Sequence, residues 1–418
     1  MKIVLRNAKV YHPSSPHHGK RVDIFIKGKK IEQIGRNLKV DSATEFKSKD
    51  LCVSIGWIDL GAQACDPGYE HREDLSSISK AAAAGGYTAL APFPNTNPVT
   101  HDKLGVDYLK SRTNTSLVDF LPIGAVTKNC EGKEITEMFD MTKAGAVAFS
   151  DGAQSIQHAG VLLRALQYVK AFDGLIIHQP KDKTIARNGQ MHEGKTSTML
   201  GLRGIPSMAE ELMVQRDLSL NEYVDSRLHF SKISTEGSVD LIKKAKRKSS
   251  NITASVSALN LLLTDQEMLG FDTNLKVLPP LRGKRDINAL KSGLKDGTID
   301  CIVSNHIPHD LETKNLEFGN AEFGAIGLQT TFAIANMALK DVDLVIEKFA
   351  IGIRKILGIE LPKIEVGESP NFTIFDPTLE WTFSTENNQS KSKNSPFLEK
   401  NLTGKVIGVI NNGMSFFN

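Results

Sequence analysis

The chain has 418 residues, 40% of them hydrophobic and 24% charged, which is ordinary for a globular protein with one large and one smaller domain. Its formal net charge of +3 gives no reason to expect nucleic acid or an anionic membrane as a partner. No apolar run reaches the roughly 18–20 residues that span a bilayer. The 4 cysteines form no CxxC pair, which argues against a disulfide framework or a cysteine zinc site.

The two ends of the chain share a β-rich texture. Short runs with period-two alternation, punctuated by Gly or Asn, occur at 2–11, 22–28, 30–35, 371–376, 379–384 and 404–413. We expect residues 1–52 and 365–418 to form one small β-sandwich domain built from both termini. The alternating first segment also lacks the continuous apolar core of a signal peptide, so we expect a cytoplasmic protein.

The middle of the chain alternates predicted strands with predicted helices. Eight short apolar runs are strand candidates, at 53–60, 87–93, 119–126, 146–150, 174–178, 227–233, 251–256 and 300–305. This order favours an α/β fold in which residues 53–364 form a (β/α)8 barrel. An open doubly wound sheet is disfavoured, because it usually carries a Gly-rich phosphate loop and no GxGxxG occurs here.

One polar, low-complexity patch, STENNQSKSKNS, lies between the last two β runs at residues 384–395. Its composition is poor in apolar residues and rich in Ser and Asn. It predicts a mobile surface loop.

Polar side chains follow several predicted barrel strands, at the end where the chemistry of a barrel takes place. A single His at a strand end is usually a satisfied polar group, but several polar residues at one rim indicate a site. The candidates are the segment 61–65, Asn95, Asp151, His178, Lys232, Asn305, His306 and His309.

A series of sequence blocks makes the chain recognisable. They include GWIDLGAQACDPGYEHREDL, AAAAGGYTALAPFPNTNPV, GAVAFSDG, MHEGKTS, PPLRGKRD, LKDGTIDCIVSNHIPH and EFGAIGLQT. In this order they resemble dihydroorotases of the type found in multifunctional complexes and many bacteria, within the amidohydrolase superfamily. The resemblance implies a barrel of the metal-dependent hydrolase type with a small β domain, which opens or closes a cyclic amide in pyrimidine biosynthesis.

The first strand end departs from the pattern of that family. The family has His-x-His, whose imidazoles bind zinc, followed by an Arg that holds the substrate carboxylate. This sequence has Gly61 and Gln63 at the His positions and Cys65 at the Arg position. Glycine has no ligand atom, an amide oxygen is a poor zinc donor, and a thiol cannot replace a guanidinium in a bidentate contact.

The other strand ends keep part of the family pattern. The ligand positions of the fourth and fifth strands are retained as Asp151 and His178. The sixth-strand His is Lys232, and the eighth-strand Asp, which the resemblance makes both ligand and general base, is Asn305. A neutral amide cannot take the proton from a metal-bound water. A substrate-contacting Asn of the family is replaced by Leu278.

Two retained ligand positions are too few for catalytic zinc, which needs about three protein ligands. We therefore expect no metal cofactor and a non-catalytic member of the family with an assembly or regulatory role. The partner that the resemblance implies is aspartate transcarbamoylase, and the resemblance also implies a homo-oligomer. As a further hypothesis, the Lys232 ammonium replaces the metal and pairs with Asp151; otherwise this side chain points into solvent.

Two alternatives remain open. The chain is an active hydrolase that binds zinc through Asp151, His178, Cys65 and His306, or it is a related cyclic amidase with a changed substrate. Asn95 and His309 are either remnants of the substrate pocket or residues that shape loops. The PN and NP neighbours of Asn95 favour a turn in any case.

Overall fold

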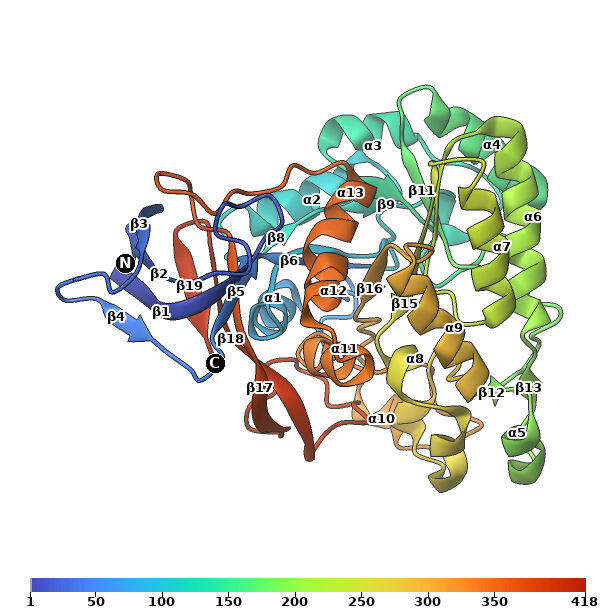
Figure 1. Cartoon of the computed structure of the whole chain (residues 1–418). Coiled ribbons are helices and arrows are strands. Elements are labelled where there is room, and N and C mark those ends of the chain that lie inside the picture. The colour runs from blue at the N-terminus through green and yellow to red at the C-terminus, as the bar shows by residue number, and fades with distance from the viewer. Residues whose placement is uncertain (1) are drawn as a thin grey trace.

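A computed structural model describes residues 2–418, in which a small sheet lies against a larger barrel of strands and helices (Figure 1). The two ends of the chain build the small sheet together. Its strands are β1 (Lys2–Tyr11), β2 (Arg21–Lys27), β3 (Lys30–Gly35), β4 (Thr44–Phe46), β5 (Cys52–Ile55), β17 (Phe372–Phe383), β18 (Lys400–Asn411) and β19 (Met414–Phe417). The sequence predicts a sandwich here, whereas hydrogen bonding links these eight strands into one sheet.

The strand β5 joins the two ends of the chain. It pairs with β1 in parallel and with β17 in antiparallel orientation, so it lies in the middle of the sheet. Gly56 follows it and begins the step into the barrel. A Cβ at this position would lie 2.0 Å from Thr88 Oγ1, so only glycine allows the chain to pass this close. The predicted boundary between residues 52 and 53 falls inside β5.

Each of the eight predicted barrel runs contains a strand. The strands are β6 (Trp57–Leu60), β7 (Tyr87–Ala91), β8 (Asp119–Phe120) followed by β9 (Ile123–Gly124), β10 (Ala148–Phe149), β11 (Leu175–His178), β14 (Arg227–Phe230), β15 (Ile252–Ser257) and β16 (Cys301–Val303). They pair in parallel as two arcs, β6-β7-β8 and β9-β10-β11-β14-β15-β16. The third strand is divided between β8 and β9 at Pro122, which has no N–H for a ladder hydrogen bond.

Side chains and loops connect the first and eighth strands, where no strand ladder forms. Asp59 in β6 is fully buried and accepts hydrogen bonds from Ser304 N at 2.7 Å and Ser304 Oγ at 2.8 Å. Just beyond the strands, Gln63 N donates to the carbonyl oxygen of His306 at 2.9 Å. The carboxylate therefore brings the first and last strands of the barrel together.

Helices surround the barrel strands (Figure 1). The larger ones are α1 (Leu75–Ala84), α2 (Lys103–Thr113), α3 (Met138–Ala144), α4 (Ala159–Lys170), α6 (Met208–Val224), α7 (Glu236–Lys246), α9 (Lys284–Lys295) and α11 (Thr331–Leu339). Asp74, Asp102 and Thr235 cap α1, α2 and α7 by accepting a hydrogen bond from a first-turn N–H. Within residues 2–418, no helix combines the length and hydropathy needed to cross a membrane.

Shorter elements complete the chain. After α11, α12 (Val342–Ile346) continues through a π-helical turn, η4 (Glu347–Ile351), into α13 (Gly352–Leu357). The remaining short elements lie in the segments that connect these strands and helices. These are η1 (Lys128–Cys130), β12 (Met191–His192), α5 (Lys195–Leu200), β13 (Gly204–Ile205), α8 (Leu259–Leu262), η2 (Asp265–Gly270), η3 (Thr273–Leu275) and α10 (Leu311–Lys314).

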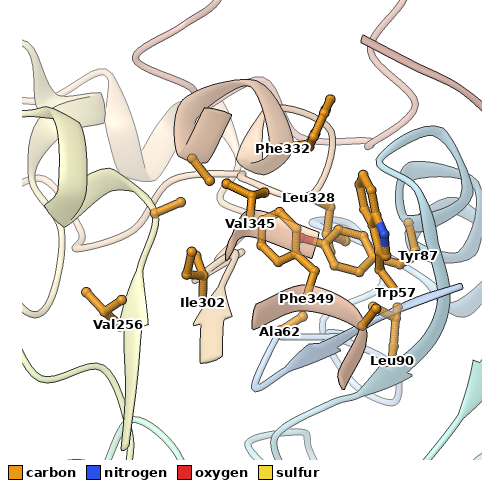
Figure 2. Packing of buried hydrophobic residues seen from close by; sticks show 14 of the residues in the cluster. Trp57, Ala62, Tyr87, Leu90, Val256, Ile302, Leu328, Phe332, Val345 and Phe349 are labelled. Atoms are coloured by element: carbon orange, nitrogen blue, oxygen red, sulfur yellow. The ribbon is translucent and has the colours of Figure 1, made fainter. Parts of the chain in front are cut away.

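One aromatic cluster connects the small sheet to the barrel. The Trp57 ring lies 5.0 Å from the Phe332 ring of α11 and 5.3 Å from the Phe349 ring of η4, between centroids, and Figure 2 shows these rings packed together. On the side of the small sheet it lies 5.5 Å from the Phe375 ring of β17. Aromatic rings of this size dominate core energetics, so the two regions share one core.

The polar patch at 384–395 is not a mobile surface loop over its second half, and that prediction is wrong. Ser392, Asn394 and Ser395 are buried. The Asn394 amide donates to the carbonyl oxygens of Ile307 and Gly324, and Ser392 Oγ donates to Arg72 O. Residues 390–395, called the strap below, thus fasten the C-terminal region to the barrel rim.

Candidate functional site

Asp151 lies at the end of β10 and is buried, as expected for a residue at the barrel centre. Both of its carboxylate oxygens are occupied by one neighbour. Thr127 N donates to Oδ1 at 2.9 Å and Thr127 Oγ1 donates to Oδ2 at 2.5 Å. Burial raises the pKa of Asp151 in spite of these hydrogen bonds. The carboxylate is therefore turned toward the loop before η1.

His178 ends β11 and is also buried. Its Nδ1 lies 2.6 Å from Asp217 Oδ2, a carboxylate that also accepts from Arg216. Its Nε2 lies 2.9 Å from the main-chain N–H of Ile156, which donates to it. With Nδ1 as the protonated nitrogen, the Nε2 lone pair, the one that would bind a metal, is engaged by the protein itself.

Lys232 follows β14 and is 4% exposed, so the possibility that it points into solvent is wrong. Its ammonium donates to Asn305 Oδ1 at 2.9 Å and lies 5.3 Å from the centre of the Phe93 ring. The hypothesis of an ion pair with Asp151 is also wrong, because within residues 2–418 the only hydrogen bond of this ammonium goes to an amide. Both oxygens of Asp151 face Thr127 instead.

Asn305 completes a chain of contacts from the sixth strand to the loop after the seventh. While its Oδ1 accepts from Lys232, its Nδ2 donates to Leu278 O at 3.1 Å. Burial lowers the pKa of Lys232 to about 8, and the negative charge of Asp59 opposes this effect. Lys232 and Asn305 both have a positive φ, which is uncommon outside glycine and marks a constrained rim.

The two positions at which the resemblance implies imidazoles are part of the loop packing. Gly61 has φ +93°, and a Cβ placed there would lie 2.6 Å from the Phe93 ring. Phe93, a buried residue just beyond β7, therefore fills the space of a side chain at 61. Gln63 is half-buried, and its main-chain N–H holds His306 O.

Cys65 and His306 are the further ligands that the alternative zinc site would need. Burial raises the pKa of Cys65 to about 12, so the free thiol stays protonated. His306 accepts a hydrogen bond at Nδ1 from Gly327 N, and its Nε2 lies 3.4 Å from Glu73 Oε2. This ring is thus directed toward the first loop and the strap, away from Asp151.

The candidate substrate residues are held by loops. Asn95 is half-buried, donates to Asp151 O at 3.1 Å and accepts from Ala153 N at 3.1 Å, so it joins the loops after β7 and β10. His309 Nε2 lies 3.1 Å from Phe323 O, and burial lowers the pKa of His309 to about 4. Leu278 packs against a small apolar cluster whose residues come from β13, α6 and nearby loops.

These contacts do not fit the metal that the resemblance implies. Within residues 2–418 there is no group of three or more His, Cys, Asp and Glu side chains that could hold a metal ion. Each Asp151 oxygen accepts a hydrogen bond from Thr127, His178 Nε2 accepts one from Ile156 N, and an ammonium lies at the sixth-strand position. Positive charge at that position repels a cation.

Four residues that shape the site are absent from the sequence predictions: Asp59, Phe93, Thr127 and Asp217. Asp59 could have been singled out from the sequence, because a carboxylate in the apolar strand WIDL is expected to have a hydrogen-bonding partner. Asp217 is buried on the inner face of α6, which is also detectable as an interruption of an apolar face. Phe93 and Thr127 carry no such signal, since both residue types are common in loops and cores.

The chain is similar over nearly its whole length to curated dihydroorotases. It is 40% identical to one from Thermoanaerobacter sp., covering 97% of this chain and 95% of the relative. It is 36% identical to one from Geotalea daltonii, covering 99% and 98%. Residues 51–238 match the family described as Dihydro-orotase-like.

Solved structures share the fold at lower identity. The chain superposes on the L-hydantoinase (dihydropyrimidinase) from Arthrobacter aurescens with a TM-score of 0.85 at 23% identity, covering 99% of this chain and 95% of the other. The dihydropyrimidinase from Brevibacillus agri gives 0.82 at 20%, covering 100% and 95%. At such identity the likeness establishes the architecture alone, and it agrees with the predicted barrel.

Proposed function

The chain belongs to the dihydroorotase family, and from that premise we propose that it is a non-catalytic member with an assembly or regulatory role in pyrimidine biosynthesis. The observation that carries the proposal is that both retained ligand groups are engaged by the protein. Asp151 is bound by Thr127, and His178 Nε2 accepts from Ile156 N. A metal shared by the two groups would have to compete with these hydrogen bonds.

The loss of the general base supports the same proposal. The family hydrolyses a cyclic amide with a water that must give up a proton, and the eighth-strand position here carries an amide. Asn305 Oδ1 accepts from Lys232 and its Nδ2 donates to Leu278 O. No carboxylate contacts this position within residues 2–418, so none offers an evident substitute.

A second candidate is an active dihydroorotase, or a related cyclic amidase, with atypical zinc ligation. The names of the full-length relatives favour this candidate over the first. It requires Asp151 and His178 to break their present hydrogen bonds and to gain a third ligand.

The two candidates differ in metal content and turnover. Purified full-length protein is analysed for zinc and assayed with dihydroorotate, with the Thermoanaerobacter relative as the positive control. We expect no stoichiometric zinc and no turnover above the uncatalysed rate. About one or two zinc ions per chain together with turnover would reject the proposal and establish the second candidate.

Restoring the metal ligands of the family tests which substituted positions prevent hydrolysis. The single variants Gly61→His, Gln63→His, Lys232→His and Asn305→Asp are each expected to remain inactive, because metal ligands act cooperatively. The combined four-site variant is more informative, with Phe93→Ala added to make space beside residue 61. Activity in a single variant would contradict the proposal.

The proposed partner, aspartate transcarbamoylase, comes from the family resemblance, as does self-association. Sedimentation velocity of the chain alone and mixed with the aspartate transcarbamoylase of the same organism tests both. We expect an oligomer of the chain and a larger mixed species. Independent sedimentation of the two proteins would remove this partner from the proposal.

A further inference from the structure

The helix α6 carries apolar side chains on its outward face, where a surface helix is normally charged. Its inner face buries the carboxylates of Glu210 and Asp217. On the outside, residues one helical turn apart form a stripe that contains no charged side chain. The stripe consists of Met208, Leu212, Gln215, Ser219 and Tyr223. All five are exposed, Tyr223 to 78%, so three large apolar side chains on one helix face are left uncovered.

A groove of about 610 Å³ lies beside this stripe, between α6 and α7. Its apolar lining consists of Leu218, Leu241, Ala245 and Ile252. At one end of the two helices, a Cβ added to Gly237 would lie 2.5 Å from the carboxyl group of Glu211. At the other end, Lys248 Nζ donates to Glu222 at 2.9 Å, so the helices run in the same direction. The stripe and the groove form one surface, called the α6 face below, at the edge of the barrel away from the small sheet (Figure 1).

The α6 face is acidic toward one end and basic toward the other. Where both helices begin, Glu211 and Asp240 form no ion pair within residues 2–418, and these two residues are called the acidic end. Toward the close of α7, Lys244 and Arg247 form none in the same part of the chain, and they are called the basic end. The other lysines of KKAKRK, at 243–248, pair with acidic residues of this chain.

A second copy of the chain is complementary to this face. In a two-fold dimer the same surface of both copies is in contact, and a two-fold axis across the helices makes the two α6 helices antiparallel. Met208 and Leu212 then lie toward Tyr223 of the second copy, and the acidic end of each copy lies over the basic end of the other. A two-fold axis along the helices would place like charges on each other, so the charges select the antiparallel arrangement.

We propose that the α6 face joins two copies of this chain in a two-fold dimer with antiparallel α6 helices. The inference rests on the self-association included in the proposed function, and it adds the surface and the orientation of the two copies. A partner protein of one charge sign is a poorer match, because the face carries both signs around an uncharged stripe.

Sedimentation velocity of the full-length protein over a range of concentrations measures the dissociation constant of the dimer. Leu212→Asp places a charge in the apolar contact, and we expect it to weaken the dimer at least about tenfold. Leu104→Asp is the matched control, because Leu104 is an exposed leucine on a different helix, α2. It should dimerise as the wild type does, and thermal unfolding shows that both variants are folded.

Charge reversal tests the orientation. Glu211→Lys and Lys244→Glu each bring like charges together between the copies, and each should weaken the dimer by about threefold to tenfold. The double variant should return to the affinity of the wild type, because a lysine again faces a glutamate of the other copy. Two weakened single variants without recovery in the double variant would reject the antiparallel arrangement.

A wild type that stays monomeric, or a dimer that Leu212→Asp leaves unchanged, would overturn the inference. If Leu212→Asp removed a complex with aspartate transcarbamoylase but left self-association intact, the α6 face would bind that partner and the inference would be wrong. Zinc analysis and the dihydroorotate assay report separately on the absence of catalysis, since neither depends on how the copies associate.

Discussion

Phe93 fills the space beside Gly61 that any side chain at this position would need. Replacement by Ala places a Cβ 2.6 Å from the ring, at a φ of +93°. We expect Gly61→Ala to lower the free energy of unfolding by about 1–3 kcal/mol from overpacking, with backbone strain in addition. Urea unfolding measures the change.

The matched control for this variant is Gly367→Ala. Gly367 has φ +94°, but no atom lies within 4 Å of its added Cβ. Its substitution reports the backbone strain alone and should cost less than Gly61→Ala. Equal losses in the two variants would show that the Phe93 ring yields easily, and that the rim has room for a ligand side chain.

His229 in β14 makes the stability of the fold depend on pH. The ring is fully buried, with Thr253 Oγ1 at 2.9 Å and Ser255 Oγ at 3.0 Å from its nitrogens. Burial lowers the pKa of His229 to about 3, below the usual 6.5 of the unfolded chain. The unfolded chain therefore takes up the proton first. The contribution of the neutral His229 ring to the free energy of unfolding is complete above about pH 6.5. It is lost as the pH falls toward 3.

Between pH 7 and pH 5 this group should cost the wild type about 2 kcal/mol of unfolding free energy. His229→Gln is expected to be less stable at pH 7 but to lose less on acidification. Urea unfolding at pH 7, 6 and 5 gives the slopes. The exposed His158→Gln serves as the control and should follow the wild type. An unchanged slope in His229→Gln would contradict the prediction.

At the scale of elements, the strap is attached through Glu73. This fully buried carboxylate accepts from Ser390 Oγ and from Lys391 N, and lies near His306 Nε2. Although burial opposes its ionisation, His306 and the Ser390 hydroxyl lower the pKa of Glu73 on balance. The strap is therefore held by an ionised acceptor.

Glu73→Gln puts an amide among these donors. We expect it to lower the free energy of local opening of the strap by about 1–3 kcal/mol, because one buried donor loses its acceptor. Hydrogen exchange should accelerate in residues 390–395 before it does so elsewhere. Lys391→Ala, which removes the partly exposed ion pair with Asp74 and a hydrogen bond to Glu70 O, should change exchange much less. Uniform acceleration across the barrel would mean that Glu73 stabilises the core rather than the strap.

The sequence predicts elements better than their side-chain partners. The apolar runs at 174–178 and 227–233 contain β11 and β14 because buried strands need continuous apolar residues. The prediction for the strap is wrong because Ser and Asn are typical of loops, whereas here the Asn394 amide donates to buried carbonyl groups. The partner of Lys232 depends on a left-handed backbone and on the position of Asn305 across the barrel, which local patterns do not encode.

For the whole molecule, the shared aromatic core means that the barrel needs the small sheet in order to fold. Trp57 packs against the barrel rings of Phe332 and Phe349 (Figure 2). It also packs against Phe375 of the sheet. A chain that ends at residue 371 would lack β17, β18 and β19 and would expose this cluster. We expect it to be aggregated or unfolded, as judged by circular dichroism and sedimentation, and not to form an isolated barrel.

The full-length chain should show one calorimetric transition, since neither region has a core of its own around Trp57. Two separate transitions, or a truncated chain that melts cooperatively, would contradict this prediction. The comparison needs no ligand and no partner.

The middle position of β5 also has a consequence for synthesis on the ribosome. One edge of β5 pairs with β17 in the folded protein, and the first residue of β17, Phe372, follows β5 by more than 300 residues in the sequence. Until then the nascent polypeptide carries an open hydrogen-bonding edge, a template for wrong pairing with another copy. Slow translation would lengthen that interval, so the yield of native protein should depend on elongation speed and on chaperones that shield the N-terminal strands.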